Sequence, residues 1–116
     1  MTPCELLICA EDAMVNSYSP YSGFSVGAAL ITADGRVYKG CNIENSAFSP
    51  TICAERTAFF KAISEGENDF EAIAIVGKYK NGEYKHLCYP CGVCRQVMKE
   101  FCGGDFKIIL GDGKGE

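Results

Sequence analysis

The sequence predicts an α/β fold, in which layers of helices pack on a mixed β-sheet. Three observations predict it: helical and strand-like patterns alternate along the chain, two early strands flank an Asp-Gly turn, and two βα-type segments follow them. A chain of 116 residues fits a single domain with a two- or three-layer core. We therefore expect one domain that spans residues 1–116.

The N-terminal part of the chain predicts a helix and then a β-hairpin. Residues 3–18 carry apolar side chains three and four positions apart, as an amphipathic helix does. The segment 19–23, which contains a proline and a glycine, ends this helix. Two strands, at 24–32 and 37–43, are then joined across 33–36, where Asp-Gly is a hairpin signal.

The rest of the chain alternates helix and strand. An alanine-rich segment predicts a helix that begins at Cys53, and Pro90 can open a later helix because its missing N–H is not needed there. The predicted elements are, in order, a loop at 45–52, a helix at 53–64, a buried strand at 72–76, a polar stretch at 78–86, a helix from Pro90 until Gly103 and a strand at 106–110.

Charge and hydropathy exclude several classes of partner. Eleven Lys and Arg against fifteen Asp and Glu give a net charge of −4, and no basic run offers the face that a nucleic acid requires. No stretch reaches about 18 apolar residues, and the start lacks a basic and then apolar leader. We expect a cytoplasmic protein without nucleic-acid or membrane partners, in which the eight cysteines bind metal or stay as free thiols rather than form disulfides.

Two short segments predict a metal site with a carboxylate that takes part in catalysis. Cys53-Ala54-Glu55 and Pro90-Cys91-Gly92-Val93-Cys94 together offer three thiols and one carboxylate. Three protein ligands leave the fourth tetrahedral position of zinc for water, which distinguishes a catalytic from a structural zinc site. Each segment lies where a helix should begin, and helix N-termini favour thiolates. Glu55 beside that water would carry its proton to a leaving group.

Geometry and charge add two expectations. Cys53 and Glu55 would point to nearly opposite sides of a helix, so they can share a site only if the metal lies beyond the helix end. Zinc with three thiolates has an excess of one negative charge, which opposes the activation of water. We expect Arg56 and Gln96 to donate hydrogen bonds to the sulfurs and offset this charge, whereas Arg95 is either such a donor or a surface residue.

Other readings of the thiols remain open. Cys41 or Cys88 as a fourth thiolate would close the site and give a non-catalytic, zinc-stabilised binding module. In a redox protein, Cys91 and Cys94 would form a reducible bond and the first thiol segment would not be needed. His86, the only histidine, is either a ligand or a solvated residue of the polar stretch.

Four segments together resemble the small, homotetrameric cytidine deaminases, in order and at similar spacing, from near the start of the chain to about Leu110. They are PYSGFSVGAA at 20–29, GCNIEN at 40–45, CAERTA at 53–58 and PCGVCRQ at 90–96. The resemblance implies a three-layer α/β/α domain with a mixed central sheet, one Zn²⁺ per subunit and a homotetramer with shared active sites.

The same resemblance implies roles for individual residues. The expected zinc ligands are Cys53, Cys91 and Cys94, and the expected proton carrier is Glu55. The expected substrate contacts are Asn42 and Glu44 at the sugar hydroxyls, Phe24 against the nucleoside and the Ala54 backbone at the base.

The reaction that the resemblance implies is hydrolytic deamination of cytidine and 2′-deoxycytidine, a step of pyrimidine salvage. Zinc-bound hydroxide attacks C4 while Glu55 protonates N3 and then carries a second proton to the departing amine, giving uridine or 2′-deoxyuridine and ammonia. Glu44 would repel a phosphate, which favours a nucleoside over a nucleotide. A deaminase of another aminopyrimidine, such as a nucleoside antibiotic, is the alternative, and the Asn-Ile-Glu-Asn segment at 42–45 argues against it.

The end of the chain departs from the family. Residues 111–116 have the pattern of a turn that leads into another strand, whereas relatives continue into a final segment with a phenylalanine that reaches a neighbouring active site. We interpret the chain as lacking that segment, and without it we expect weaker stacking on the base and lower affinity for the substrate.

Overall fold

The computed structural model describes residues 2–47, 51–79, 84–85 and 92–111. Its elements are α1 (Pro3–Ala13), the 3₁₀ turn η1 (Met14–Asn16), β1 (Phe24–Thr32), β2 (Val37–Cys41), α2 (Ala54–Ser64), β3 (Phe70–Tyr79), β4 (Tyr84–Lys85), α3 (Gly92–Phe101) and β5 (Lys107–Leu110). Across these ranges no helix combines the length and the apolar character that crossing a membrane requires.

The strands form one mixed sheet with β3 at its centre. β1 pairs antiparallel with both β2 and β3. On the other edge of β3, β5 runs parallel along Ala72–Ile75, and β4 pairs antiparallel at Gly77 and Lys78. The mixed sheet predicted from the sequence is confirmed.

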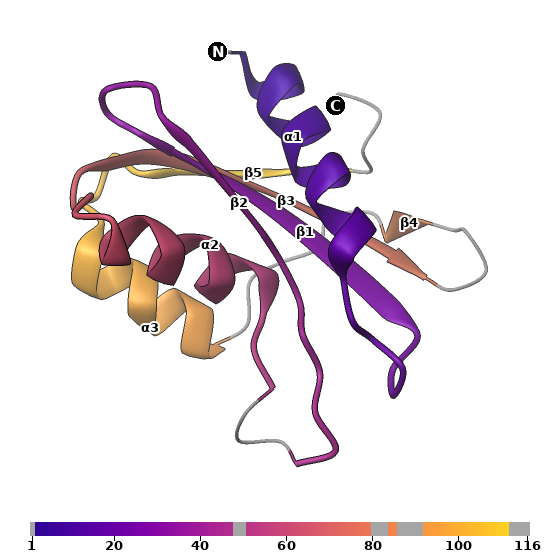
Figure 1. Ribbon diagram of the computed structural model, residues 1–116. Helices are drawn as coiled ribbons and strands as arrows, with labels where there is room; N and C mark the ends of the chain where they lie inside the picture. Colours follow the sequence, from indigo (N-terminus) through magenta and orange to yellow (C-terminus); the bar gives the residue numbers. More distant parts are fainter. Residues whose placement is uncertain (1, 48–50, 80–83, 86–91, 112–116) are drawn as a thin grey trace.

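Helices cover both faces of this sheet, α1 on one face and α2 with α3 on the other (Figure 1). Successive side chains of a strand point to opposite faces, so β1 and β3 supply two separate cores. The core under α1 contains Leu6, Leu7, Ala10, Ala29, Ile31, Ala74 and Val76. The core under α2 and α3 contains Ala28, Leu30, Ala58, Phe59, Ile73, Ile75 and Met98. The three-layer α/β/α arrangement is therefore confirmed.

Helix α1 starts as its sequence indicates but ends earlier than predicted. The Thr2 hydroxyl accepts a hydrogen bond from the N–H of Glu5 (3.2 Å), and the Glu5 carboxylate accepts one from the N–H of Thr2 (2.9 Å), which is a capping box. After Ala13 the chain tightens into η1, which buries no side chain, and Ser17 has extended backbone. The predicted continuation of the helix to residue 18 was wrong because a further turn would bury little apolar surface.

The hairpin of β1 and β2 is confirmed, with a shorter second strand than predicted. The turn contains Gly35 at φ +92°, a conformation that glycine adopts without steric cost. β2 ends at Cys41 rather than at residue 43, because the side chain of Asn42 takes up the next backbone groups of β1, the N–H of Val26 and the carbonyl of Phe24. The backbone N–H of Asn42 still donates to the carbonyl of Val26 (3.2 Å), and its side-chain amide makes the bonds beyond it in place of the backbone ladder.

Helix α2 begins directly after Cys53, which has extended backbone (φ −80°, ψ 156°) and forms the N-cap. Near its start the helix rests on β2 at Gly40. A Cβ atom on Gly40 would lie 2.4 Å from the carbonyl oxygen of Ala54 and 2.6 Å from the nitrogen of Ala58. This close approach fixes where α2 begins relative to the sheet.

The later elements follow the predicted order with different bounds. β3 extends on both sides of the predicted 72–76, because its ends pair with β1 from Thr32 to Phe24. β5 begins at Lys107, one position after the predicted start. α3 is described from Gly92 onward, and the prediction that Pro90 opens it lies outside the described residues, as do those for His86 and Cys88.

Candidate active site

Cys53 and Cys94, far apart in the sequence, approach the same two side chains. Cys53 caps α2, and Cys94 lies in the first turn of α3, where it is 1% exposed. Both cysteines interact with Glu55 and Arg56. Free N–H groups in the first turn of a helix stabilise a thiolate relative to a thiol. Two thiols at helix starts therefore meet on the α2 and α3 face of the sheet.

A positive charge lies beside these thiols. Nη2 of Arg56 donates to Sγ of Cys53 at 3.5 Å and to the carbonyl of Thr51 at 3.4 Å. The hydrogen bond to Cys53, with further contributions from Cys94, holds the pKa of Arg56 above its ordinary value. Nε of Arg56 is buried and meets no acceptor among the residues that the structure describes. The guanidinium is thus held by its hydrogen bonds, while its Nε–H remains a buried donor.

Glu55 is buried at the start of α2, with 4% of its surface exposed. Burial raises the pKa of its carboxyl, and the nearby Cys53 charge raises it further, although hydrogen bonds with its own backbone N–H and with Cys94 act in the opposite direction. A carboxyl whose pKa lies above its usual range exchanges protons more readily near neutral pH. Glu55 is therefore suited to carry protons next to the thiols.

This set of groups fits a zinc ion held by thiolates. Thiols at helix starts supply ligands, Glu55 supplies a proton acceptor, and Arg56 offsets negative charge. The buried Nε of Arg56 fits a further anionic acceptor such as a third thiolate. Cys91, the third predicted ligand, lies outside the described residues, and within those ranges no three Cys, His, Asp or Glu side chains gather as a metal-binding group.

Asn42 is 8% exposed and is bonded to β1 and to the segment after α1. Its Oδ1 accepts from the N–H of Val26 at 2.9 Å and from the hydroxyl of Ser17. Its Nδ2 donates to the carbonyl of Phe24 at 2.9 Å. Asn42 thereby fixes the backbone at the start of β1, at Phe24 and at Val26.

Glu44 is held by the turn that precedes β1. Its Oε1 accepts from the N–H of Tyr21 (3.0 Å) and of Ser22 (3.1 Å), and its Oε2 accepts from the hydroxyl of Ser22. Burial acts to raise the pKa of Glu44, but these hydrogen bonds outweigh it and hold the pKa below the ordinary value. Glu44 therefore stays ionised at neutral pH.

Phe24 forms an aromatic pair with Tyr79, its cross-strand neighbour on β3. The ring centroids are 4.8 Å apart and the planes are inclined by 44°. Tyr79 is 45% exposed, so the pair lies at the edge of the core and part of its aromatic surface is accessible to solvent. Ala54, the first residue of α2, is fully buried beside Glu55.

A comparison with families of known proteins identifies the chain. The model of the cytidine and deoxycytidylate deaminase zinc-binding region matches residues 2–110. The chain belongs to this deaminase family. The family resemblance predicted from the sequence is confirmed.

Named members of the deaminase family are similar to the chain over most of its length. The cytidine deaminase of Sporosarcina psychrophila is 49% identical over 112 residues, which cover 97% of this chain and 79% of that protein. The cytidine deaminase of Halalkalibacterium halodurans is 50% identical over 107 residues, 92% of this chain and 77% of that protein. The crystal structure of cytidine deaminase from Burkholderia pseudomallei matches with a TM-score of 0.87 and 42% identity, over 100% of this chain and 89% of that one.

Within this deaminase fold, Ser17, Ser22 and Tyr79 are among the residues that contact predicted site residues and that the sequence analysis missed. Ser22 lies inside the family-like segment at 20–29, which was the available signal, whereas nothing in the sequence marked Ser17 or Tyr79. Gln96, predicted to donate to a sulfur, has an exposed side chain. Its role stays a prediction.

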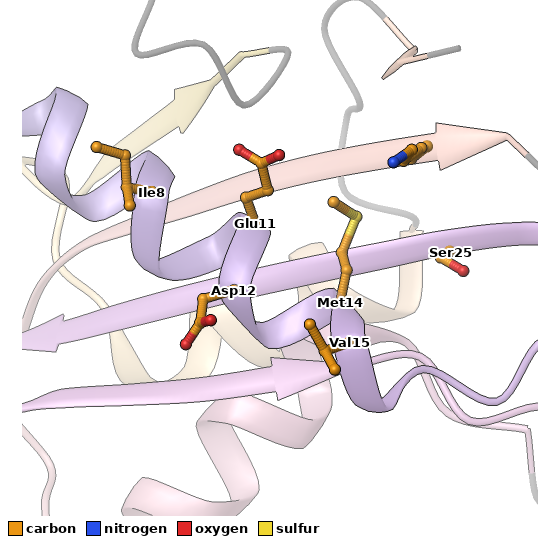
Figure 2. A pocket seen from close by; sticks show the side chains of 7 residues that line it. Ile8, Glu11, Asp12, Met14, Val15 and Ser25 are labelled. Carbon is orange, nitrogen blue, oxygen red and sulfur yellow. The ribbon is translucent and has the colours of Figure 1, made fainter. Parts of the chain in front are cut away.

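A cavity of about 530 Å³ lies on the opposite face of the sheet, beside α1 (Figure 2). Ile8, Met14 and Val15 line it together with the polar side chains of Glu11, Asp12, Ser25 and Lys78. None of the predicted site residues contributes to it. The cavity is therefore separate from the candidate active site.

Proposed function

We propose that this protein is a zinc-dependent cytidine deaminase that converts cytidine and 2′-deoxycytidine to uridine and 2′-deoxyuridine with release of ammonia. One observation supports this most directly: Glu55, Arg56, Cys53 and Cys94 interact with one another at the starts of two helices. The relatives named above as cytidine deaminases support the choice of substrate. We further propose that the enzyme acts in pyrimidine salvage and that it does so in the cytoplasm.

Cys53, Cys91 and Cys94 would hold one zinc ion in each subunit. When bound, zinc supplies a Lewis acid that makes a water molecule acidic enough to attack an electron-poor carbon. Glu55 takes a proton from that water, delivers it to N3 of the pyrimidine as C4 is attacked, and returns a second proton to the leaving amine. Burial around Glu55 supports this role because it favours the protonated form between the two transfers.

Asn42, Glu44 and Phe24 orient the nucleoside. Asn42 uses one Nδ2 hydrogen on the Phe24 carbonyl, and among the described residues its second hydrogen has no acceptor, which leaves a donor for a sugar hydroxyl. Glu44 stays ionised and accepts from a hydroxyl. Its charge repels a phosphate, so the enzyme prefers a nucleoside to a nucleotide. The Ala54 backbone contacts the base.

The deciding experiment measures ammonia release by the purified, zinc-loaded protein. Cytidine, 2′-deoxycytidine, the monophosphate and an aminopyrimidine nucleoside antibiotic are assayed in parallel. We expect turnover of the two nucleosides and a loss of about 10²–10⁴-fold in kcat in Glu55→Gln, which keeps the side-chain volume but cannot carry protons. Preferential turnover of the antibiotic would show that cytidine is not the preferred substrate. Unchanged kcat in Glu55→Gln would refute the mechanism.

We further propose a homotetramer in which the active sites are shared between subunits. Large apolar side chains on the α1 face support subunit contacts, since Ile8 is 58% and Val15 80% exposed (Figure 2). Light scattering coupled to size-exclusion chromatography tests the number of subunits. A monomer at micromolar concentration would contradict the proposal.

A further inference from the structure

The hydroxyl of Ser22 joins two of the predicted substrate contacts. It donates to Oε2 of Glu44 and accepts from the N–H of Phe24 at 3.1 Å. A serine hydroxyl has one donor and two acceptor positions, so it can serve both partners at once. The carboxylate at the sugar site and the start of β1 are therefore linked through one oxygen atom.

The partners of Ser22 are restrained from their other sides. Oε1 of Glu44 accepts from the N–H groups of Tyr21 and Ser22, and the carbonyl of Phe24 accepts from Asn42. The backbone N–H groups hold Oε1, and the hydroxyl of Ser22 is the group that holds Oε2, so the restraint on the second carboxylate oxygen comes from this hydroxyl. The direction in which Oε2 of Glu44 presents its remaining lone pair thus depends on this hydroxyl.

We propose that Ser22 is a positioning residue for nucleoside binding, which acts by fixing the orientation of the Glu44 carboxylate relative to Phe24. The inference rests on the proposed function, since it requires that Glu44 bind a sugar hydroxyl. A hydrogen bond from a neutral hydroxyl to a carboxylate is stronger than one between neutral groups, so its loss frees the carboxylate measurably. Binding of the sugar, rather than the chemistry at the base, then weakens.

Ser22 is exposed in a turn, so the experiment has to distinguish a positioning role of its hydroxyl from a purely structural one. A structural role would affect every substrate and would not depend on Glu44. A positioning role affects only substrates that carry a 2′- or 3′-hydroxyl and vanishes when Glu44 is replaced. The neighbouring Ser19 offers a matched control, because its hydroxyl pairs with that of Ser25 and belongs to the same turn.

The experiment compares Ser22→Ala, Ser22→Thr and Ser19→Ala in the zinc-loaded enzyme, with unfolding curves to establish that each variant is folded. We expect Ser22→Ala to raise KM for cytidine about tenfold with kcat changed less than about twofold. Ser22→Thr restores KM to within about threefold because it keeps the hydroxyl, and Ser19→Ala leaves it unchanged. A shift of the same size in Ser19→Ala would overturn the inference.

Two further measurements test whether Ser22 acts through Glu44. In a Glu44→Gln background, Ser22→Ala is expected to add less than about twofold to KM, since the group it orients has changed. With 2′,3′-dideoxycytidine, which lacks the 2′- and 3′-hydroxyls, the KM of Ser22→Ala is expected to equal that of the parent enzyme. If the increases in KM from the two substitutions are additive, or if Ser22→Ala raises KM equally for the dideoxynucleoside, the inference is wrong but the proposed function stands. Absence of turnover in the unmutated enzyme instead refutes the proposed function, and the inference with it.

Discussion

Nη2 of Arg56 lies 3.5 Å from Sγ of Cys53, and the same guanidinium interacts with Cys94. Arg56 is the third residue of the helix that Cys53 caps and directly follows Glu55. A single turn of backbone therefore holds a thiol, a carboxyl group and a guanidinium. Their mutual positions depend little on distant parts of the chain, whereas the meeting with Cys94 depends on how α2 and α3 pack.

Replacement of Arg56 by Ala is expected to weaken zinc binding or activity by about 10–100-fold, because negative charge on the thiolates is no longer offset. The measurement is zinc retained after dialysis against graded chelator, together with kcat/KM. Arg95→Ala is the matched control, since Arg95 directly follows Cys94 but has an exposed side chain. Equal zinc loss in both variants would show that Arg56 has no specific role.

Replacement of Asn42 by Ala is expected to lower the free energy of unfolding by about 1–3 kcal/mol. The reason is that the N–H of Val26 and the carbonyl of Phe24 lose their side-chain partner at a buried position. Urea unfolding measures the change. Asn16→Ala, at an exposed position of η1, should stay within about 0.5 kcal/mol of the parent. Equal stabilities of the two variants would contradict the structural role of Asn42.

Replacement of Gly40 by Ala is expected to destabilise the protein by about 1–3 kcal/mol or more, because the added Cβ meets helix backbone rather than a flexible side chain. Displacement of α2 should also reduce activity. Gly104→Ala serves as the control, because a Cβ there meets nothing within 4 Å. Thermal unfolding and kcat/KM check both variants, and a Gly40→Ala enzyme with parental values would refute the tight packing of α2 on β2.

Cys102 is expected to react slowly with iodoacetamide. Burial raises the pKa of its thiol to about 11. Only the thiolate reacts, and at pH 8 a thiol with this pKa is ionised to about 0.1%. The rate should therefore rise about tenfold for each pH unit between about pH 8 and 10. Peptide mass spectrometry compares Cys102 with the exposed Cys4, and comparable labelling at pH 8 would contradict the prediction.

Several features follow from the sequence alone. The apolar spacing of α1, the Asp-Gly turn at Gly35 and the alanine-rich start of α2 at Cys53 are local patterns, and each is present near its predicted place. The four segments at 20–29, 40–45, 53–58 and 90–96 together indicated the deaminase family, and two of them carry the thiols and the carboxylate that a zinc site needs. Residue types within one turn determined these outcomes without reference to distant parts of the chain.

Only the tertiary structure decided which distant residues meet. The end of β2 at Cys41 depends on the Asn42 amide reaching β1, and the end of α1 depends on how little the next turn would bury. Ser22 became relevant because residue 44 lies beside its turn, and Tyr79 because the antiparallel register sets it against Phe24. Sequence periodicity reports the face of an element that is buried, whereas the partner across that face is chosen by the packing of all the elements together.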